Sequence, residues 1–282
     1  MKKKCLTPGC YEPADCWHGY CAGHCPKRHP IRDHHRSRKP TTSVPHIGVE
    51  IEVQFSCTDL RKRVLPLKAH YDGSLETGSN VGAEFKILAP AKQIAKKATR
   101  VLRQLWERKA KITPKCGLHV HLDVRQATPA RITALLDWAQ LTQEVWFGLV
   151  PPSRRENHYC TRITKTNRSQ HYTWMNLTRH KTLEVRLHAG TLNPFKLEGW
   201  LVAMEHLQHK LLDETYTFPA AAPAVTDETG SQSVIPPEAE AFWAVFADCP
   251  KAGKEYLQAR SKANGQLRDF AFATQDNASE EN

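Results

Sequence analysis

The sequence predicts an α+β fold, because segments with the two-residue period of strands alternate along the chain with segments that have the helical period. The clearest strand is 182–189, in which apolar residues occupy every second position. The positions between them hold Glu184, Arg186 and His188. The clearest helix is 90–109, with an apolar face and a basic face that we interpret as solvated. We therefore expect a sheet with one face in the core and a polar opposite face.

The composition is that of a globular protein with one large domain and appendages. The chain has 282 residues, 40% hydrophobic and 24% charged, with a formal net charge of +11. It contains no apolar run of membrane-spanning length, and no apolar stretch of a secretory signal follows the basic start. Because the cysteines cluster near that start, we expect metal ligands in a reducing compartment, and hence a cytoplasmic protein.

Residues 1–28 are predicted to form a small zinc-binding unit. Two close pairs of ligands have the spacing of a structural tetrahedral zinc site and resemble the short zinc fingers of phage and bacterial proteins. The ligands are Cys5, Cys10, Cys21 and His24, and Cys25 is an alternative to His24 as the fourth. So short a segment needs a metal to fold.

A basic linker, 29–46, follows this unit. The first 40 residues contain nine Lys/Arg against three carboxylates, a net charge of +6. A basic arm of this kind indicates contact with an acidic partner, either a nucleic acid or a protein, and its alternative role is solubility.

The main domain is predicted at 47–215, an Ala/Pro-rich linker at 216–239, and a C-terminal helical segment with a tail at 240–282. The strand candidates are 47–55, 68–76, 83–88, 117–124, 171–178 and 182–189. A second helix begins at Thr128-Pro129, an N-cap followed by proline, and runs toward Gly148. A third follows Asn193-Pro194 and extends to about Leu212. The polar stretch from Pro151 to His171 is long for a connection and indicates a functional loop or lid.

Paired polar residues recur on three of the predicted strands. Each pair is two positions apart and therefore points to one side of its strand. The pairs are Glu50 with Glu52, His119 with His121, and Glu184 with Arg186. The segment 182–189 alone is also compatible with an exposed edge strand of mixed charge, but the repetition favours a site.

If these strands share a sheet, four carboxylates crowd one surface and need cations for neutralisation. They are Glu50, Glu52, Glu84 and Glu184. Carboxylates with few imidazoles suit Mg²⁺ or Mn²⁺, and Arg186 suits phosphate oxygens. The competing interpretation of His119-x-His121 is a zinc-dependent amide hydrolase.

Four motifs, in order, resemble the amidoligase family of the glutamine synthetase and glutamate–cysteine ligase superfamily over residues 47–213. They are Gly48-Val49-Glu50-Ile51-Glu52; Asp72-Gly73-Ser74 with Gly82-Ala83-Glu84 and Pro90; Cys116 to His121; and Asn176 with Thr182 to Arg186 and Gly190-Thr191. This resemblance implies a curved, mainly antiparallel sheet that forms a funnel, with helices packed outside.

The resemblance also implies roles for the residues. Glu50, His119 and Glu184 would hold one Mg²⁺ or Mn²⁺ ion, and Glu52 with Glu84 a second. His121 would face ATP, and Arg186 would stabilise the transferring phosphoryl group. Asp72 and Asn176 match substrate or amine positions, or are a turn aspartate and a strand-end cap. From their place in the long loop, Arg154 and Arg155 are candidates for binding substrate carboxylate or phosphate, and solvation is the equal alternative.

The predicted activity is an ATP-dependent ligation of a carboxylate and an amine through an acyl phosphate. The carboxylate would come from an amino acid or a peptide, and oligomerisation is left open. A nucleic-acid-binding protein that acts through its finger and basic arm is the non-enzymatic alternative, and it describes only the N-terminal region.

Overall fold

The computed structural model describes residues 44–56, 69–75, 80–220 and 236–263. The predicted zinc ligands and most of the basic linker 29–46 lie outside these ranges. Within them, the element order begins with β1 (His46–Ser56), β2 (Ala69–Tyr71), a 3₁₀ turn η1 (Gly73–Leu75), β3 (Asn80–Pro90), α2 (Ala91–Glu107) and β4 (Gly117–Asp123). It continues with α3 (Pro129–Leu141), α4 (Gln143–Gly148), a 3₁₀ turn η2 (Pro152–Arg154), β5 (Met175–Leu177), β6 (Thr182–Ala189), α5 (Pro194–Leu212), α6 (Pro237–Val245) and α7 (Lys251–Ala263).

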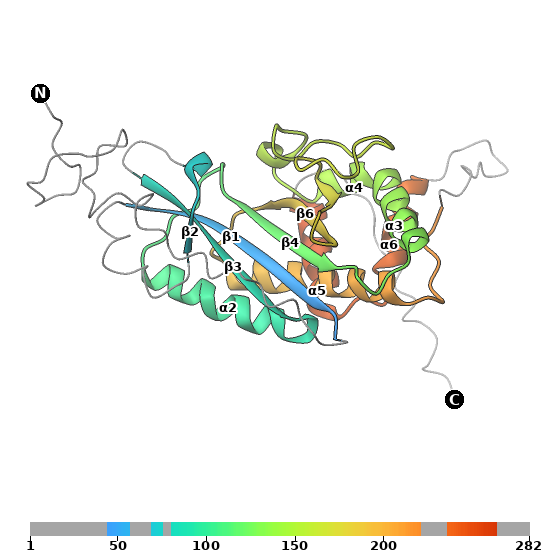
Figure 1. Cartoon of the computed structure of the whole chain (residues 1–282), viewed down its shortest axis with the longest axis horizontal. Helices are drawn as coiled ribbons and strands as arrows, with labels where there is room; N and C mark the ends of the chain where they lie inside the picture. Colours follow the sequence, from blue (N-terminus) through green and yellow to red (C-terminus); the bar gives the residue numbers. More distant parts are fainter. Residues whose placement is uncertain (1–43, 57–68, 76–79, 221–235, 264–282) are drawn as a thin grey trace, which may run out of the picture.

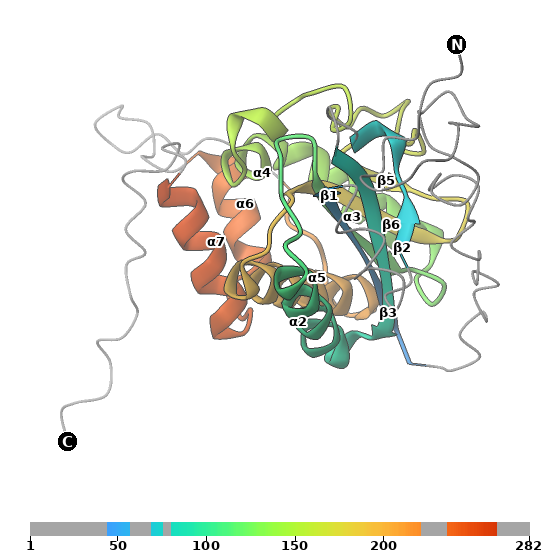
Figure 2. The same cartoon turned by 90° about the vertical axis from the view of Figure 1, so that its left-hand side faces the viewer.

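The strands form one sheet of six, in the order β2-β3-β1-β4-β6-β5, and every neighbouring pair is antiparallel. The helices α2 and α5 lie along one face of this sheet (Figures 1 and 2). The predicted α+β architecture with an antiparallel sheet is therefore confirmed for the described residues.

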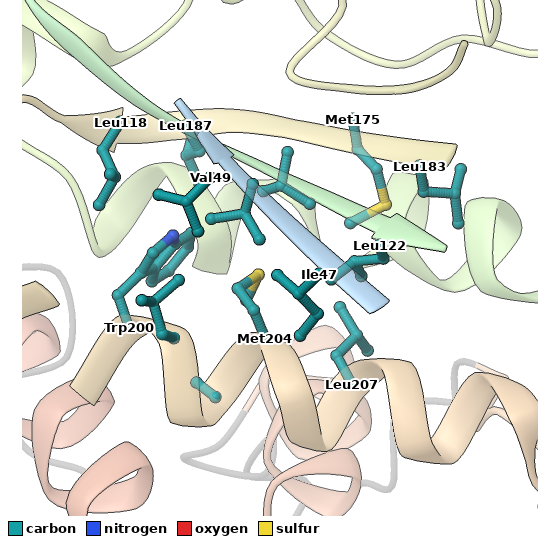
Figure 3. Packing of buried hydrophobic residues seen from close by; sticks show 14 of the residues in the cluster. Ile47, Val49, Leu118, Leu122, Met175, Leu183, Leu187, Trp200, Met204 and Leu207 are labelled. Atoms are coloured by element: carbon teal, nitrogen blue, oxygen red, sulfur yellow. The ribbon is translucent and has the colours of Figure 1, made fainter. Parts of the chain in front are cut away.

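The core lies between the sheet and α5. The strand residues Ile47, Val49 and Leu118 point toward Trp200 and Met204 on the helix, as Figure 3 shows, and all five are at most 1% exposed. Alternation along each strand leaves its polar residues on the opposite face. The side chain of Gln208 on α5 ties the layers together, because its amide nitrogen donates to the carbonyl oxygens of His46 at 2.9 Å and Asp123 at 3.1 Å.

Two helix starts follow the predicted signals. Thr128 caps α3 by accepting a hydrogen bond from the backbone N–H of Arg131 at 3.3 Å. Asn193 caps α5 by accepting from the N–H groups of Phe195 and Lys196 at 2.9 and 3.2 Å. In both helices proline occupies the first turn, where no N–H is needed.

Several predicted elements differ in extent from the structure. Of the expected strand 68–76, the structure describes 69–75, and within this range only Ala69–Tyr71 join the sheet, because the chain turns at Asp72 into η1. The single helix expected to run toward Gly148 is divided into α3 and α4 at Thr142, whose hydroxyl bonds back to the carbonyl of Trp138 at 2.8 Å. Strand β5 holds only Met175–Leu177 of the expected 171–178.

The C-terminal helices α6 and α7 pack into the same core as the sheet. Trp146 on α4 is the centre of an aromatic cluster, with ring centroids 5.0 Å from Phe242 on α6 and 5.4 Å from Trp174. Phe218, inside the predicted linker 216–239, packs 5.7 Å from Trp138, and α6 already begins at Pro237. The helical segment predicted near 240 is thus part of the main hydrophobic unit, with Phe242 fully buried.

His188 does not lie on the polar face of β6, contrary to the alternation expected from sequence. Between the pairs Leu118↔His188 and Val120↔Val185 the register shifts by one residue, which marks a β-bulge. A bulge adds one residue to a strand and reverses the side on which the next side chains point. His188 therefore packs under the sheet, with its ring centroid 5.1 Å from Trp200.

No helix among the described residues has the length and hydropathy required to cross a lipid bilayer.

Candidate active site

A cavity of about 700 Å³ lies on the polar face of the sheet, opposite α2 and α5. Its walls come from β1, β3, β4 and β6 and from the long loop between α4 and β5. Ten of the eleven candidate site residues of the main domain line it, namely Glu50, Glu52, Asp72, Glu84, His119, His121, Arg154, Asn176, Glu184 and Arg186. Arg155 does not, and its Nε instead donates to the carbonyl oxygen of Val150 at 3.0 Å.

The strand register explains why residues far apart in sequence meet. Glu50 on β1 is directly opposite His119 on β4, and His121 is opposite Glu184 on β6. Glu52 is opposite Glu84 on β3 in the same way. Because opposite residues of antiparallel strands project to the same face, the pairs form one contiguous polar surface.

Glu50 lies at the centre of this surface. Its Oε2 is 3.4 Å from His119 Nδ1, and its Oε1 is 3.5 Å from His121 Nε2 and 2.8 Å from Lys86 Nζ. Burial by itself would raise the pKa of Glu50, but the neighbouring imidazoles of His119 and His121 lower it below its usual range. Glu50 is therefore a carboxylate that stays ionised inside the cavity.

Glu184 is buried at the other side of the cluster, with 3% of its side chain exposed. Its Oε1 accepts a hydrogen bond from Arg186 Nη1 at 2.5 Å and lies 3.7 Å from His119 Nδ1. Its Oε2 accepts from the amide of Asn176 at 3.3 Å. Burial is the largest single influence and opposes ionisation, but Arg186, His121 and His119 together outweigh it and lower the pKa of Glu184.

Glu52 and Glu84, predicted to hold a second ion, lie opposite one another and make different contacts. Glu52 Oε2 accepts a hydrogen bond from the backbone N–H of Gly117 at 2.6 Å. A Cβ at Gly117 would lie 2.6 Å from His119 Nε2, so this close approach requires glycine. Glu84 instead groups with Glu50 and His119, and burial and the charge of Glu50 raise its pKa to about 8.

The long loop after α4 contributes a buried cation. Arg154 in η2 is 2% exposed, and its Nη2 donates to the backbone carbonyl of Arg186 at 2.7 Å. Its Nε has no hydrogen-bond partner among the described residues. Arg154 is thus held in place while keeping a donor available, and it is not the solvated surface residue of the alternative interpretation.

Asp72 and Asn176 combine a structural contact with a place in the cavity wall. Asp72 Oδ1 accepts from the backbone N–H of Ser74 at 2.9 Å and from its hydroxyl at 2.7 Å, as a turn aspartate does. Asn176 is 2% exposed and donates to Glu184, so it helps orient that carboxylate.

Among the residues of the cavity wall that sequence analysis did not identify are Lys86, Tyr159 and Tyr172. Lys86 lies between Glu50 and Glu84, and its two-residue spacing from Glu84 was a usable signal. Tyr159 and Tyr172, from the loop between α4 and β5, were less predictable because no strand period places them. The backbone carbonyl oxygen of Tyr159 accepts a hydrogen bond from the side-chain Nε of Arg186 at 3.2 Å. The ring centroid of Tyr172 is 5.8 Å from the guanidinium carbon of Arg186.

The donor atoms fit a divalent cation of the hard or borderline class. Two groups have ligand atoms close enough to share an ion, Glu50–Glu84–His119 and Glu50–His121–Glu184. Nε2 of His121 is buried and has no hydrogen-bond partner among the described residues, although two carboxylates flank it. Two carboxylates and one imidazole in each group suit Mg²⁺ or Mn²⁺ better than a histidine-rich set would.

A family model described as "Putative amidoligase enzyme" matches residues 67–173. This range includes the second and third of the four motifs, with Glu84, His119 and His121, and it also holds Arg154. The first and fourth motifs, with Glu50 and Glu184, fall outside it. The match therefore supports the resemblance to amidoligases over a little more than a third of the chain. A search among curated proteins finds no significant match.

Solved structures with similar chain paths include "Apo GmaS without ligand", at 14% identity and a TM-score of 0.47, covering 78% of this chain and 69% of that chain. A GmaS/ADP complex has 14% identity and a TM-score of 0.40, with coverages of 78% and 70%. The complex of the prokaryotic ubiquitin-like protein Pup with its ligase PafA has 9% identity and a TM-score of 0.35, with coverages of 78% and 64%.

Proposed function

We propose that this protein is an ATP-dependent carboxylate–amine ligase that forms an amide or isopeptide bond through an acyl phosphate. The observation that carries the proposal is the meeting of three glutamates, two histidines and two arginines in one cavity. These residues are Glu50, Glu84, Glu184, His119, His121, Arg154 and Arg186. The amidoligase model that matches residues 67–173 supports the same reaction class.

The carboxylate cluster would hold Mg²⁺ or Mn²⁺ through Glu50, His121 and Glu184, and through Glu50, Glu84 and His119. Bound there, divalent ions would neutralise the charge of nucleotide phosphates and of the carboxylates themselves. The sheet keeps these side chains in place before any ligand arrives, because each belongs to a strand paired on both sides. Such preorganisation is the main requirement for phosphoryl transfer.

The two arginines would bind the transferring phosphoryl group. Arg186 is fixed by Glu184, by the carbonyl of Tyr159 and by the ring of Tyr172, so its planar donors are held toward the cavity. Arg154 adds a second buried cation beside it. A guanidinium offers two parallel donors to phosphate oxygens, which makes this pair suited to a developing negative charge.

In the first step, an oxygen of the substrate carboxylate forms a bond with the γ-phosphorus of ATP, and the bond between that phosphorus and the β–γ bridging oxygen breaks to release ADP. In the second step, the amine nitrogen forms a bond with the acyl carbon, phosphate leaves, and the amine gives up a proton. The loop between α4 and β5, which covers one wall of the cavity, would keep water away from the acyl phosphate.

The composition of the two ligand groups argues against the zinc hydrolase. Each combines two carboxylates with a single imidazole, among the residues that the structure describes. His119 and His121 also contact different carboxylate oxygens of Glu50, so the pair is divided between the groups. This arrangement favours an oxygen-rich ion site over a histidine-based zinc site.

The test uses Glu184→Gln, Arg186→Lys and the double variant, with ADP formation measured against pools of amino acids, peptides and amines by mass spectrometry. Glu184→Gln removes a ligand charge and should lower turnover by about 100-fold or more. Arg186→Lys keeps the charge but loses the planar two-point contact, so it should slow the phosphoryl step while nucleotide still binds. Both residues act on one transition state, so the double variant should lose far less than the product of the two effects.

Matched controls are Glu107→Gln and Arg103→Lys, both on the exposed face of α2. They should leave turnover unchanged. An amide hydrolysis that needs zinc but not ATP, and that tolerates Arg186→Lys, would replace the ligase proposal with the hydrolase.

A further inference from the structure

Lys86 places a positive charge inside the carboxylate cluster. It is opposite Glu50 in the register of β1 and β3 and two residues from Glu84 on the same strand. Its Nζ is 2.8 Å from Glu50 Oε1 and 3.0 Å from Glu84 Oε2, and 36% of its side chain is exposed. Both glutamate side chains are largely buried, at 16% and 15% exposed, so salt and water screen this contact less than they screen a surface ion pair.

The two ligand groups differ in how open they are to a cation. In the group of Glu50, Glu84 and His119, the Lys86 ammonium already uses one oxygen of each glutamate. In the group of Glu50, His121 and Glu184, the buried Nε2 of His121 has no hydrogen-bond partner among the described residues. An ion entering this group meets the ammonium only at Glu50, the ligand that both groups share, whereas an ion beside Glu84 meets it at both glutamates. At Glu184 it meets only the Arg186 contact on one oxygen.

We propose that the Lys86 ammonium is a tethered cation that competes with a divalent ion for the Glu50–Glu84 pair. This inference rests on the proposed metal-dependent function. A first ion binds at Glu50, His121 and Glu184, and a second enters beside Glu84 only when Lys86 moves away. Two effects weaken binding of this later ion beside Glu84. The ammonium occupies the oxygens that the ion needs, and its charge repels the ion at short range.

The same residue stabilises the protein before metal binds. Four glutamates line the cavity, and ionised carboxylates this close together are destabilising without a counter-charge. Lysine is suited to this exchange, since its ammonium is a compact charge on a flexible stem and can leave its partners without moving the strand. Removing Lys86 should therefore make the protein less stable without metal and more dependent on it.

The test is a Mn²⁺ titration of the full chain, by calorimetry and by counting bound Mn²⁺ with electron paramagnetic resonance. The variants are Lys86→Met, which removes the charge at similar length, and Lys86→Arg, which keeps it. In the wild type we expect one ion to bind at least about tenfold more tightly than the next. In Lys86→Met the second ion, the one beside Glu84, should bind at least about tenfold more tightly than in the wild type. In Lys86→Arg this second ion should still bind weakly.

Two controls define the background. Lys97→Met removes a lysine that bonds the carbonyl of Leu88 at 2.7 Å, outside the cavity wall, and should titrate as the wild type does. Glu50→Gln removes the ligand shared by both groups and reports Mn²⁺ bound elsewhere on the chain. The rise in melting temperature on adding Mn²⁺, measured in parallel, should be larger for Lys86→Met than for Lys97→Met.

Identical binding constants in the wild type and Lys86→Met would overturn the role of Lys86 while leaving the metal site intact. Mn²⁺ binding that is equal in the wild type, Lys86→Met and Glu50→Gln would overturn both, because the cavity then holds no ion. Turnover does not enter these comparisons, so the result is independent of the unidentified substrates.

Discussion

His188 should make the stability of this protein fall as the pH is lowered below neutrality. The imidazole is 6% exposed and lies between β6 and the helices α5 and α7. Its Nδ1 donates to the carbonyl of Ala189 at 2.5 Å, and its Nε2 accepts from the hydroxyl of Tyr256 at 2.6 Å. Burial lowers the pKa of His188 from 6.5 to about 3, because a charged imidazole would lose its hydration in this position.

The sign and size of the effect follow from the two pKa values. Above pH 6.5 the imidazole is neutral in the folded and unfolded chain, and it contributes no pH dependence. As the pH falls below 6.5, the imidazole becomes protonated in the unfolded chain but stays neutral in the folded chain until about pH 3. The free energy of unfolding therefore decreases across this pH window. At about 1.4 kcal/mol for each unit, the loss reaches roughly 2 kcal/mol at pH 5.

The assay is urea unfolding at pH 8 and pH 5, with the wild type compared with His188→Gln. Glutamine can still donate and accept hydrogen bonds but does not titrate, so its loss of stability between the two pH values should be smaller by about 2 kcal/mol. Other titrating groups, including the buried His206, are common to both proteins and cancel. Tyr256→Phe is the control: it keeps the imidazole and therefore the acid sensitivity, at a cost of about 1–3 kcal/mol at both pH values. Equal acid sensitivity in the wild type and His188→Gln would refute the reasoning.

Two further predictions concern the ends of the chain. Phe242→Ala should lower the free energy of unfolding, measured by urea denaturation, by about 3–5 kcal/mol, because α6 contributes this ring to the aromatic cluster of Trp146. A loss below about 1 kcal/mol would mean that α6 is dispensable for the core. Cys21→Ser should remove the zinc predicted for residues 1–28, so elemental analysis should find one zinc ion fewer per chain than in the wild type. Equal zinc in both proteins would contradict the predicted site.

The polar face of the sheet could be predicted because paired residues at two-residue spacing do not depend on distant contacts. Glu50, His119 and Glu184 were identifiable in this way, and the antiparallel register brings them together. The position of His188 could not be predicted, since a bulge adds a residue without a sequence signal of its own. Arg154 was identifiable only as one of two adjacent loop arginines, and only tertiary contacts show that it is the buried one.

The helices also show which features are encoded locally and which depend on distant contacts. The N-caps Thr128 and Asn193 act locally and were readable from sequence. The packing of α6 against Trp138 and Trp146 depends on contacts about 100 residues apart, which a local period does not encode. A proline- and alanine-rich stretch before α6 therefore suggested a separate segment, although the helix joins the main core.

The central claim, ligation through an acyl phosphate, predicts that an oxygen atom moves from the substrate carboxylate to phosphate. The direct measurement supplies ATP, Mg²⁺, an amine pool and a pool of amino acids and peptides labelled with ¹⁸O in their carboxylates, and analyses the released phosphate by mass spectrometry. The wild type should release phosphate with one ¹⁸O atom for each amide formed, and Glu184→Gln should release none above background. Amide formation with unlabelled phosphate, or turnover that proceeds without ATP, would contradict the proposed mechanism.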